Sequence, residues 1–277
     1  MFIDPHVHMV SRTTDDYARM AVAGCIAVTE PAFWAGYDRS SPQGFVDYFR
    51  QLTESEPLRA AAYGIRHHAW ICLNPKEAED HAFAKDVMAL IPDFLKCPTV
   101  LGIGEIGLNR NSRTELAVFE EHLELAAKFD TLVLVHTPHL EDKHKGTKLI
   151  LDAIRNQGSL KPGRVLIDHV EEHTVRCVLD AGFWAGMTLY PDTKCTAERA
   201  VDIMETHGTE RLWINSAGDW GHSDPLAVPK AGVTMRARGH GPDAVRRITL
   251  ENPRTFLSQS PRFSDQPLRP TAPDAIR

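Results

Sequence analysis

The feature that most constrains the fold is a regular alternation of short apolar runs and longer helix-like segments along the chain. Apolar runs typical of buried strands begin near residues 2, 25, 61, 99, 131, 165, 183 and 212, and a helical segment follows each one. Parallel sheets covered on both faces have strands of this kind, separated by helices. Eight repeats within 277 residues predict an α/β fold, a closed (β/α)₈ TIM barrel with parallel strands. An open doubly wound sheet is the alternative, although no Gly-x-Gly-x-x-Gly pattern follows the first strand.

The expected elements and domains follow from this alternation. We expect strands within residues 2–8, 25–29, 61–73, 99–106, 131–135, 165–168, 183–190 and 212–215. We expect helices within residues 15–23, 42–54, 77–91, 115–129, 147–156, 171–180, 196–207, 225–233 and 244–258. Residues 1–259 then form one barrel domain, and residues 260–277 form a Pro-rich C-terminal tail, either flexible or strapped to the surface.

Composition limits the compartment and the partners. The net charge of −6 argues against a broad basic surface for nucleic acid, although it allows a local basic cleft. The five cysteines have no Cys-x-x-Cys spacing, which is typical of free thiols in a reducing cytoplasm. We expect no secretory signal and no membrane span, because no apolar run approaches about 18 residues. A cytoplasmic protein that acts on a small molecule is therefore expected, and the oligomeric state stays open.

Two histidines follow the first apolar run at a spacing of two residues. In an extended chain, residues i and i+2 point to the same side, so His6 and His8 can converge on one point. Neutral imidazole is the commonest metal ligand. The pair supplies half of a metal site if the chain brings further ligands to the same place, and is otherwise an exposed pair at a terminus.

The further ligands are expected at the ends of other strands, because the active sites of such barrels lie at the C-terminal ends of the strands. Glu105 lies in an apolar run between glycines, where a carboxylate is costly to bury unless it is paired or bound to a metal. His136 and His169 end two consecutive apolar runs. Asp219 follows the eighth run, with Asp224 as a nearby rival that could instead cap a helix.

These positions fit a centre with two divalent ions, bridged by Glu105. The remaining ligands divide between the ions, with His6, His8 and Asp219 on one and His136 and His169 on the other. Two such ions about 4 Å apart can hold the attacking and the leaving oxygen and lower the pKa of a bound water. Asp219 could accept the proton of that water, so Glu105 and Asp219 are the expected catalytic residues. Zn²⁺ suits the four imidazoles best, whereas Mn²⁺ or Mg²⁺ suit phosphoester chemistry.

A set of polar residues could line the pocket or orient ligands. The expected substrate-binding residues are Arg66, His67, His68, His139 and Tyr190. His173 is a further candidate for orienting a ligand. Other histidines fall on expected helices and are expected at the surface: His81, His122 and His207.

At these residues the chain resembles the TatD-type branch of the metal-dependent amidohydrolase-like superfamily. The matching pieces are Asp4-x-His6-x-His8, Gly104-Glu105-Ile106-Gly107-Leu108, His136, His169 and Asp219. The resemblance implies a metal-dependent (β/α)₈ barrel with the same six ligands and hydrolytic, phosphodiesterase-like chemistry. The related phosphotriesterase branch bridges its metals with a carbamylated lysine, and here Glu105 stands at that position.

The loops depart from the nuclease pattern of that family. Residues 215–221 read Asn-Ser-Ala-Gly-Asp-Trp-Gly where the nucleases have a Thr-Asp-Ser/Ala-Pro-like signature. Residues 169–173 read His-Val-Glu-Glu-His where they have a His-x-Phe-Ser-Gly turn, and residues 11–14 also differ. The departures suggest that the metal chemistry is retained on a different substrate.

Three functions are weighed on these grounds. The first is a metal-dependent hydrolase of a small anionic ester, phosphoester or cyclic amide. The second is a deoxyribonuclease, which needs cations and stacking platforms in the loops. Candidate cations are Arg12, Arg39, Arg66, Arg110 and Lys143, and candidate platforms are Phe33, Trp34 and Trp220. The third is a non-catalytic barrel that binds a metabolite or a partner protein. Such a barrel would be expected to have lost some of the ligand-type residues, whereas this chain has all six.

Overall fold

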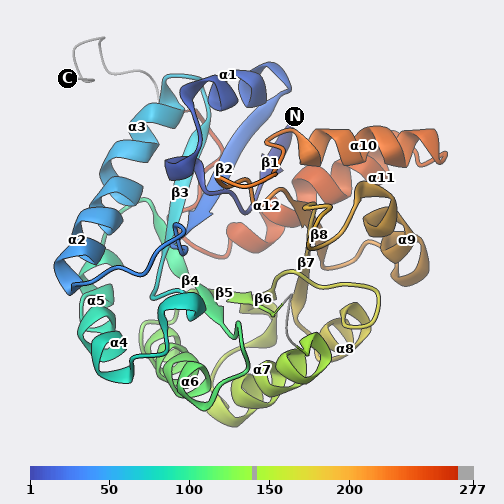
Figure 1. The fold of residues 1–277 in the computed structure, drawn as a ribbon. Coiled ribbons are helices and arrows are strands. Elements are labelled where there is room, and N and C mark those ends of the chain that lie inside the picture. Colours follow the sequence, from blue (N-terminus) through green and yellow to red (C-terminus); the bar gives the residue numbers. More distant parts are fainter. Residues whose placement is uncertain (139–141, 268–277) are drawn as a thin grey trace.

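The computed structural model describes residues 1–138 and 142–267, and these form a (β/α)₈ barrel (Figure 1). Eight parallel strands pair in chain order, and helices surround them as an outer ring. The strands are β1 Phe2–Asp4, β2 Cys25–Pro31, β3 Arg66–Ile71, β4 Val100–Gly107, β5 Leu132–His136, β6 Val165–Ile167, β7 Trp184–Thr188 and β8 Leu212–Asn215. The expected closed barrel is confirmed, and the open doubly wound sheet is excluded.

The helices lie where the sequence periodicity places most of them. They are α1 Thr14–Val22, α2 Pro42–Arg50, α3 Glu56–Ala61, α4 His81–Met88, α5 Ile91–Phe94, α6 Arg113–Lys128, α7 Lys143–Gln157, α8 Val175–Asp180, α9 Ala197–His207, α10 Ala227–Ala237, α11 Pro242–Arg246 and α12 Asn252–Leu257. A π-helical turn, Gln51–Ser55, joins α2 to α3, and a second one, Arg247–Glu251, joins α11 to α12. Short 3₁₀ turns at Met9–Ser11, Pro75–Glu77 and Pro162–Arg164 complete the connections.

The barrel closes between its first and last strands through the segments that follow them. The Ala217 amide donates to the His6 carbonyl at 2.9 Å, and the His8 amide donates to the Gly218 carbonyl at 2.7 Å. The buried Asp4 carboxylate accepts from the Ser216 amide at 3.2 Å. These bonds fix the chain around His6 and His8 against the end of β8.

Alternation along the strands divides the apolar residues between two cores. In β5, Leu132 and Leu134 point into the barrel, whereas Val133 and Val135 pack toward the helices. Phe256 of α12 contacts the inner cluster, and its ring lies 5.3 Å from Trp213 and 5.6 Å from Trp184. The barrel is therefore packed and closed toward the N-terminal ends of the strands, which leaves its polar residues at the opposite end.

The start of the expected tail packs against the barrel. Ser260 is buried, and Phe263 lies against the inner cluster. Arg254 pairs with Asp265 at 2.5 Å, and the Ser264 carbonyl lies 2.8 Å from His68 Nε2. Residues 260–267 thus form a strap, and residues 268–277 lie outside the described part of the chain.

All five cysteines are free thiols. Within residues 1–138 and 142–267, no helix is both long enough and apolar enough to cross a membrane.

Candidate metal centre

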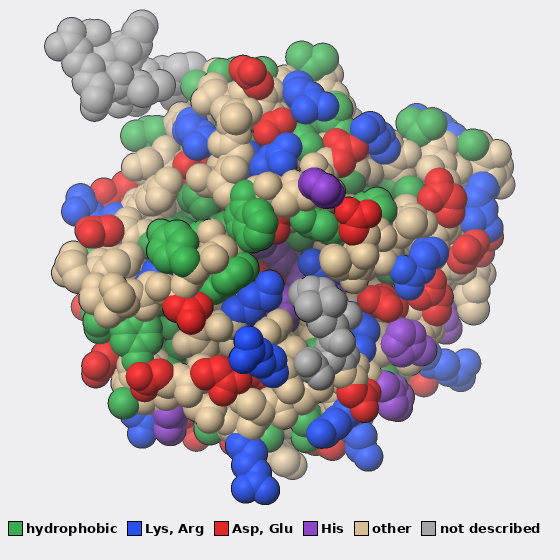
Figure 2. All heavy atoms as spheres, in the orientation of Figure 1, with side chains coloured by type: hydrophobic (Ala, Val, Ile, Leu, Met, Phe, Trp, Pro, Cys, Tyr) green, Lys and Arg blue, Asp and Glu red, His purple; other side chains and the backbone are tan. Residues whose placement is uncertain are grey.

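Four histidines and one glutamate meet at the C-terminal ends of the strands. His6 and His8 follow β1, Glu105 lies in β4, His136 ends β5, and His169 follows β6. All five side chains are buried. Figure 2 shows a hollow at the centre of this face with histidine side chains at its floor.

The ligand-type atoms are spaced as they would be around a metal ion. His6 Nε2 lies 3.1 Å from His8 Nε2 and 3.7 Å from Glu105 Oε2. Glu105 Oε2 also lies 3.0 Å from His136 Nδ1 and 3.4 Å from His169 Nε2. Donors bound at about 2.0–2.1 Å to a tetrahedral ion are separated by about 3.4 Å. The five residues therefore make two groups of three that share Glu105.

The tautomer of His6 is set by Asp168, which lies between β6 and His169 in the chain. His6 Nδ1 donates to Asp168 Oδ2 at 2.5 Å, and Asn215 Nδ2 donates to both oxygens of the same carboxylate at 3.0 and 3.1 Å. Burial raises the pKa of Asp168, but His169 and His6 outweigh it and hold that pKa below its usual value. With Nδ1 protonated, His6 directs the unprotonated Nε2 toward His8 and Glu105.

The tautomer of His169 is set by a hydroxyl relay. His169 Nδ1 donates to Thr188 Oγ1 at 2.6 Å, and Thr188 donates onward to Asn215 Oδ1 at 2.9 Å. The amide of Asn215 cannot be reversed, because its nitrogen is needed by Asp168. His169 Nε2 is therefore unprotonated, and its lone pair faces the Glu105 carboxylate and His136.

The donor set fits divalent metal ions. Unprotonated imidazole nitrogens and carboxylate oxygens that face one another are all electron-rich, and a cation between them removes the repulsion. Burial raises the pKa of Glu105, but His136 and His6 hold it well below its usual range, so the carboxylate stays charged. Burial lowers the pKa of His8 well below its usual value, which keeps this ring neutral as a ligand must be.

Glycines make room for this arrangement in two strands. A Cβ on Gly107 would lie 2.2 Å from the His136 carbonyl, so β4 and β5 can approach closely beside Glu105. A Cβ on Gly186 would lie 2.2 Å from Asp168 Oδ1, so β7 leaves space for the carboxylate that orients His6.

Comparison with known proteins places the chain in a family. A model of the TatD related DNase family matches residues 3–258, almost the whole barrel. The chain belongs to this family. An uncharacterized metal-dependent hydrolase of Methanocaldococcus jannaschii is 26% identical over 259 residues, which are 92% of this chain and 98% of that protein. This TatD-family chain is accordingly a metal-dependent hydrolase, not a non-catalytic barrel.

Solved structures show the same fold. The TatD-like protein of Archaeoglobus fulgidus superimposes with a TM-score of 0.77 and 28% identity over 93% of this chain and 100% of that one. A phosphotriesterase homology protein of Escherichia coli, complexed with phosphate in its active site, gives a TM-score of 0.64 over 92% of this chain and 98% of that one. The latter is 14% identical, so it shares the fold alone.

Asp219 lies at the edge of the TatD-family centre, outside both groups of three. It lines the pocket above them, where its Oδ1 accepts from the Gly221 amide at 2.8 Å and from the Tyr190 hydroxyl at 3.2 Å. The rival Asp224 pairs with Lys230 at 2.5 Å and does not line the pocket.

The structure does not bring the strand-3 residues into the site. The expected strand 61–73 starts too early, because α3 ends only at Ala61 and β3 begins at Arg66. Arg66, His67 and His68 therefore lie in the N-terminal half of β3, away from the C-terminal end where the site is. His67 Nε2 contacts Glu30 at 2.8 Å behind the barrel wall, and His68 contacts the C-terminal strap. Their expected role in substrate binding is therefore corrected.

Three further expected positions have different outcomes. His139 lies outside the described residues. His173 groups with the exposed Glu172, away from the pocket. His122 was expected at the surface but is buried on α6, where its Nε2 accepts from the Leu73 amide at 3.2 Å.

Several residues surround the five candidate ligands in a way that sequence reasoning missed. Asn74 Nδ2 donates to Glu105 Oε1 at 3.1 Å. Phe33 was expected only as a stacking platform for bases, and its ring instead stacks on His8 with 3.9 Å between ring centres. Lys194 lines the pocket from the loop after β7. Asp168 carries the clearest sequence signal, since it stands beside His169 at the end of an apolar run. Thr188 and Asn215 also end strands, and strand position could have identified them.

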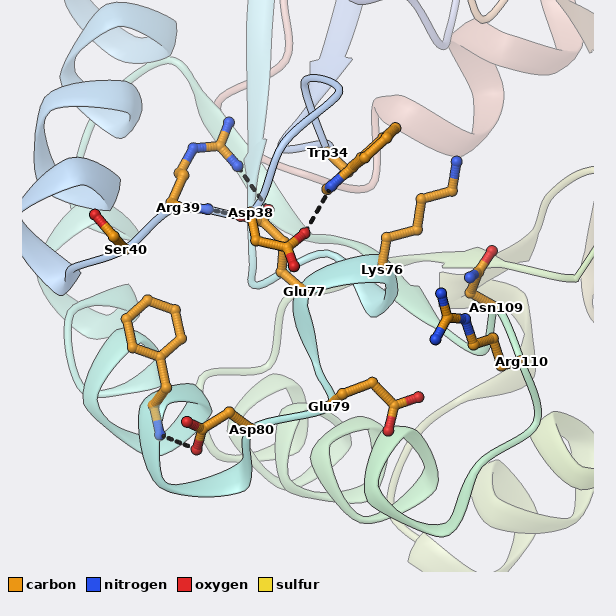
Figure 3. A pocket seen from close by; sticks show the side chains of 11 residues that line it. Trp34, Asp38, Arg39, Ser40, Lys76, Glu77, Glu79, Asp80, Asn109 and Arg110 are labelled. Atoms are coloured by element: carbon orange, nitrogen blue, oxygen red, sulfur yellow. Dashed lines mark hydrogen bonds and ion pairs between the residues drawn. The ribbon is translucent and has the colours of Figure 1, made fainter.

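The pocket at the centre is small, about 60 Å³, and adjoins a wider cleft of about 890 Å³. Trp34 and Lys76 line both of them. Figure 3 shows Lys76 between Trp34 and Arg110 in the cleft, with Asp38 bonded to the Trp34 indole. The pocket has room for a reacting group, and the cleft has room for the rest of a substrate.

Proposed function

We propose that the protein hydrolyses an ester, phosphoester or cyclic amide bond of a small anionic molecule. The observation that carries this proposal is the convergence of four histidines on one buried carboxylate, with the protonation of two rings fixed by hydrogen bonds. We propose two divalent ions per chain. His6, His8 and Glu105 would hold one, and Glu105, His136 and His169 the other.

Bound divalent metal would act as a Lewis acid and make water nucleophilic near neutral pH. Zn²⁺ is the best match for four imidazoles, with Mn²⁺ or Mg²⁺ as alternatives. The chain's own groups supply the remaining functions. Asp168 and Thr188 orient His6 and His169, and Asn74 steadies Glu105.

Asp219 is proposed as the proton acceptor and as a further ligand. Tyr190 and Gly221 hold its Oδ1, so within the described residues Oδ2 is the oxygen that no donor engages. From that position Oδ2 can accept a proton from water and later return it to the leaving group. Tyr190 would keep the carboxylate aimed at the pocket, which replaces its expected role as a direct substrate contact.

The size and charge of the site support a small anionic substrate. The inner pocket is about 60 Å³, and Lys194 and Lys76 both line it. The fold relative from Escherichia coli holds phosphate in its active site, which is consistent with an anion at this place in the fold.

A deoxyribonuclease is the second candidate, and one observation favours it. Trp34 and Trp220 lie 6.3 Å apart beside the pocket, and Trp220 is exposed. Two indoles at the entrance could stack on bases.

The test of the proposed function is Glu105→Gln. Because Glu105 belongs to both groups, its neutral amide should weaken both metals and lower turnover by about 100-fold or more. Elemental analysis of protein expressed with added metal should give two ions for the wild type and fewer for the variant.

His6→Ala should mainly remove one ion, and His136→Ala the other. Trace metal in the wild type, or full metal content and normal turnover in Glu105→Gln, would contradict the proposal. A screen over phosphoesters, lactones, amides and DNA would then identify the substrate class.

A further inference from the structure

Lys194 is a half-buried lysine that points into the metal pocket. Within residues 1–138 and 142–267, no carboxylate oxygen lies within 4 Å of its ammonium group, and no side chain accepts a hydrogen bond from it. Its Nζ lies 5.1 Å from the centre of the Tyr190 ring. Burial lowers the pKa of Lys194, while Glu105, Asp168 and Asp219 act in the opposite direction.

The loop that carries Lys194 is held firmly. The Lys194 amide donates to the Tyr190 carbonyl at 2.8 Å, and the next amide, that of Cys195, donates to the Thr188 carbonyl at 3.1 Å. The Lys194 carbonyl accepts from Arg199 at 2.5 Å, and Arg199 is anchored by two bonds of 2.7 Å to Glu172. These bonds fix the backbone from which the Lys194 side chain extends.

The charges in the pocket do not balance once metal is bound. Glu105 and Asp219 line the pocket with Lys194, and the buried Asp168 carboxylate lies behind it, near enough to raise the pKa of Lys194 with them. The positive charge of one divalent ion and of the Lys194 and Lys76 ammonium groups already exceeds the negative charge of these three carboxylates. An anionic group on the substrate restores the balance, and an ammonium group is a suitable point-charge partner for phosphate oxygens.

We propose that Lys194 is the specificity-determining residue of this site, binding an anionic oxygen of the substrate and selecting phosphoesters over neutral esters. This inference rests on the proposed hydrolase function and goes further by naming one residue and one class of substrate. Lys76 assists at the junction with the cleft, where its Nζ lies 4.9 Å from the Trp34 ring (Figure 3). The phosphoryl group would lie in the inner pocket, and its ester substituent would extend into the cleft.

The experiment measures binding of inorganic phosphate to the metal-loaded protein by calorimetry. Lys194→Met should weaken phosphate binding roughly 10- to 100-fold, because one charge-assisted bond is lost. Lys194→Arg, which keeps the charge, should recover most of the affinity. Lys96→Met changes an exposed lysine paired with Asp93 and is the matched control, which should bind as the wild type does.

A second arm compares two model esters. For p-nitrophenyl phosphate, Lys194→Met should raise KM by a similar factor, so the ratio of kcat/KM for this ester to kcat/KM for p-nitrophenyl acetate should fall by about that factor. Elemental analysis should give the same metal content for all four proteins.

Three results would overturn the inference: unchanged phosphate affinity in metal-loaded Lys194→Met, loss of metal in that variant, or a wild type that hydrolyses only neutral esters. The last result would leave the proposed hydrolase function standing. Failure of the wild type to take up metal would instead contradict the proposed function.

Discussion

At the scale of single residues, the centre depends on which nitrogen of each imidazole carries a proton. Asp168 fixes His6 directly, and Asn215 links Asp168 to Thr188, which fixes His169. The side-chain amide of Asn215 thus links the orientations of two candidate ligands that follow different strands. Groups that orient ligands in this way are worth about 10- to 100-fold in metal affinity.

Thr188 offers a sharp test of this relay. Thr188→Val keeps the shape but removes the acceptor for His169 Nδ1, so we expect metal affinity to fall roughly tenfold or more. Thr188→Ser keeps the hydroxyl and should remain close to the wild type. Competition with a chromogenic chelator measures the affinities. Equal affinity in the Val and Ser variants would show that the hydroxyl does not orient His169.

At the scale of elements, the centre requires β6, β7 and β8 to approach closely. Asp168 fills space that exists only because β7 has glycine at residue 186. A Cβ added at Gly186 would also lie 2.6 Å from the Trp213 indole nitrogen in β8. Two buried side chains would therefore have to move to accommodate it.

Gly186→Ala should therefore destabilise the fold by about 1–3 kcal/mol, as overpacking of a core does, and weaken metal binding by displacing Asp168. Gly163→Ala is the matched control, because a Cβ there meets nothing within 4 Å. Thermal unfolding and metal titration of both variants test this. A Gly186→Ala protein as stable as Gly163→Ala would refute the packing argument.

Sequence patterns predicted the elements, and the convergence of five candidate ligands, better than they predicted what surrounds those residues. Strand ends such as His136 are readable because apolar runs stop there. His169 has a φ of 60°, in the left-handed region, and no local pattern signals that backbone turn. The start of β3 was also placed too early. It lies at Arg66 because pairing with β2 begins there, which the sequence pattern does not reveal. Lys194 depends on a loop whose course only tertiary contacts determine.

His122, on α6, gives a pH prediction away from the centre. Burial lowers its pKa to about 4 from an ordinary 6.5, and its Nε2 must stay unprotonated to accept from Leu73. Its neutral form therefore stabilises the fold above pH 6.5, and this contribution is lost as the pH falls from 6.5 toward 4. The loss amounts to about 3 kcal/mol at most.

Urea unfolding of the metal-free protein between pH 4.5 and 7 measures this effect. His122→Gln keeps an acceptor for Leu73, so its free energy of unfolding should fall less steeply on acidification. Identical slopes for the wild type and His122→Gln would mean that His122 does not titrate in this window.

At the scale of the whole molecule, the cationic side chains are arranged to bind one small anionic group and not a long polyanion. The net charge is −6, and most of the expected loop cations are already engaged. Arg12 pairs with Asp16, Arg39 with Glu77, and Lys143 with Glu171. Arg66 lies at the opposite end of its strand. Lys76, Lys194 and Arg110 remain near the pocket, which is a compact set and not a continuous track.

This distribution predicts that the protein hydrolyses DNA poorly or not at all. Binding a single strand draws on a cationic groove that follows several phosphates, together with stacking platforms. Trp34 and Trp220 could serve as platforms, but Asp38 and Glu79 line the cleft that a strand would follow. The measurement is cleavage of single-stranded DNA with Mg²⁺, Mn²⁺ or Zn²⁺, beside hydrolysis of p-nitrophenyl phosphate by the same preparation. Asp219→Asn serves as the control for a contaminating nuclease. Weak cleavage that persists in the variant is the expected result, whereas strong cleavage that disappears in the variant would make the second candidate function the correct one.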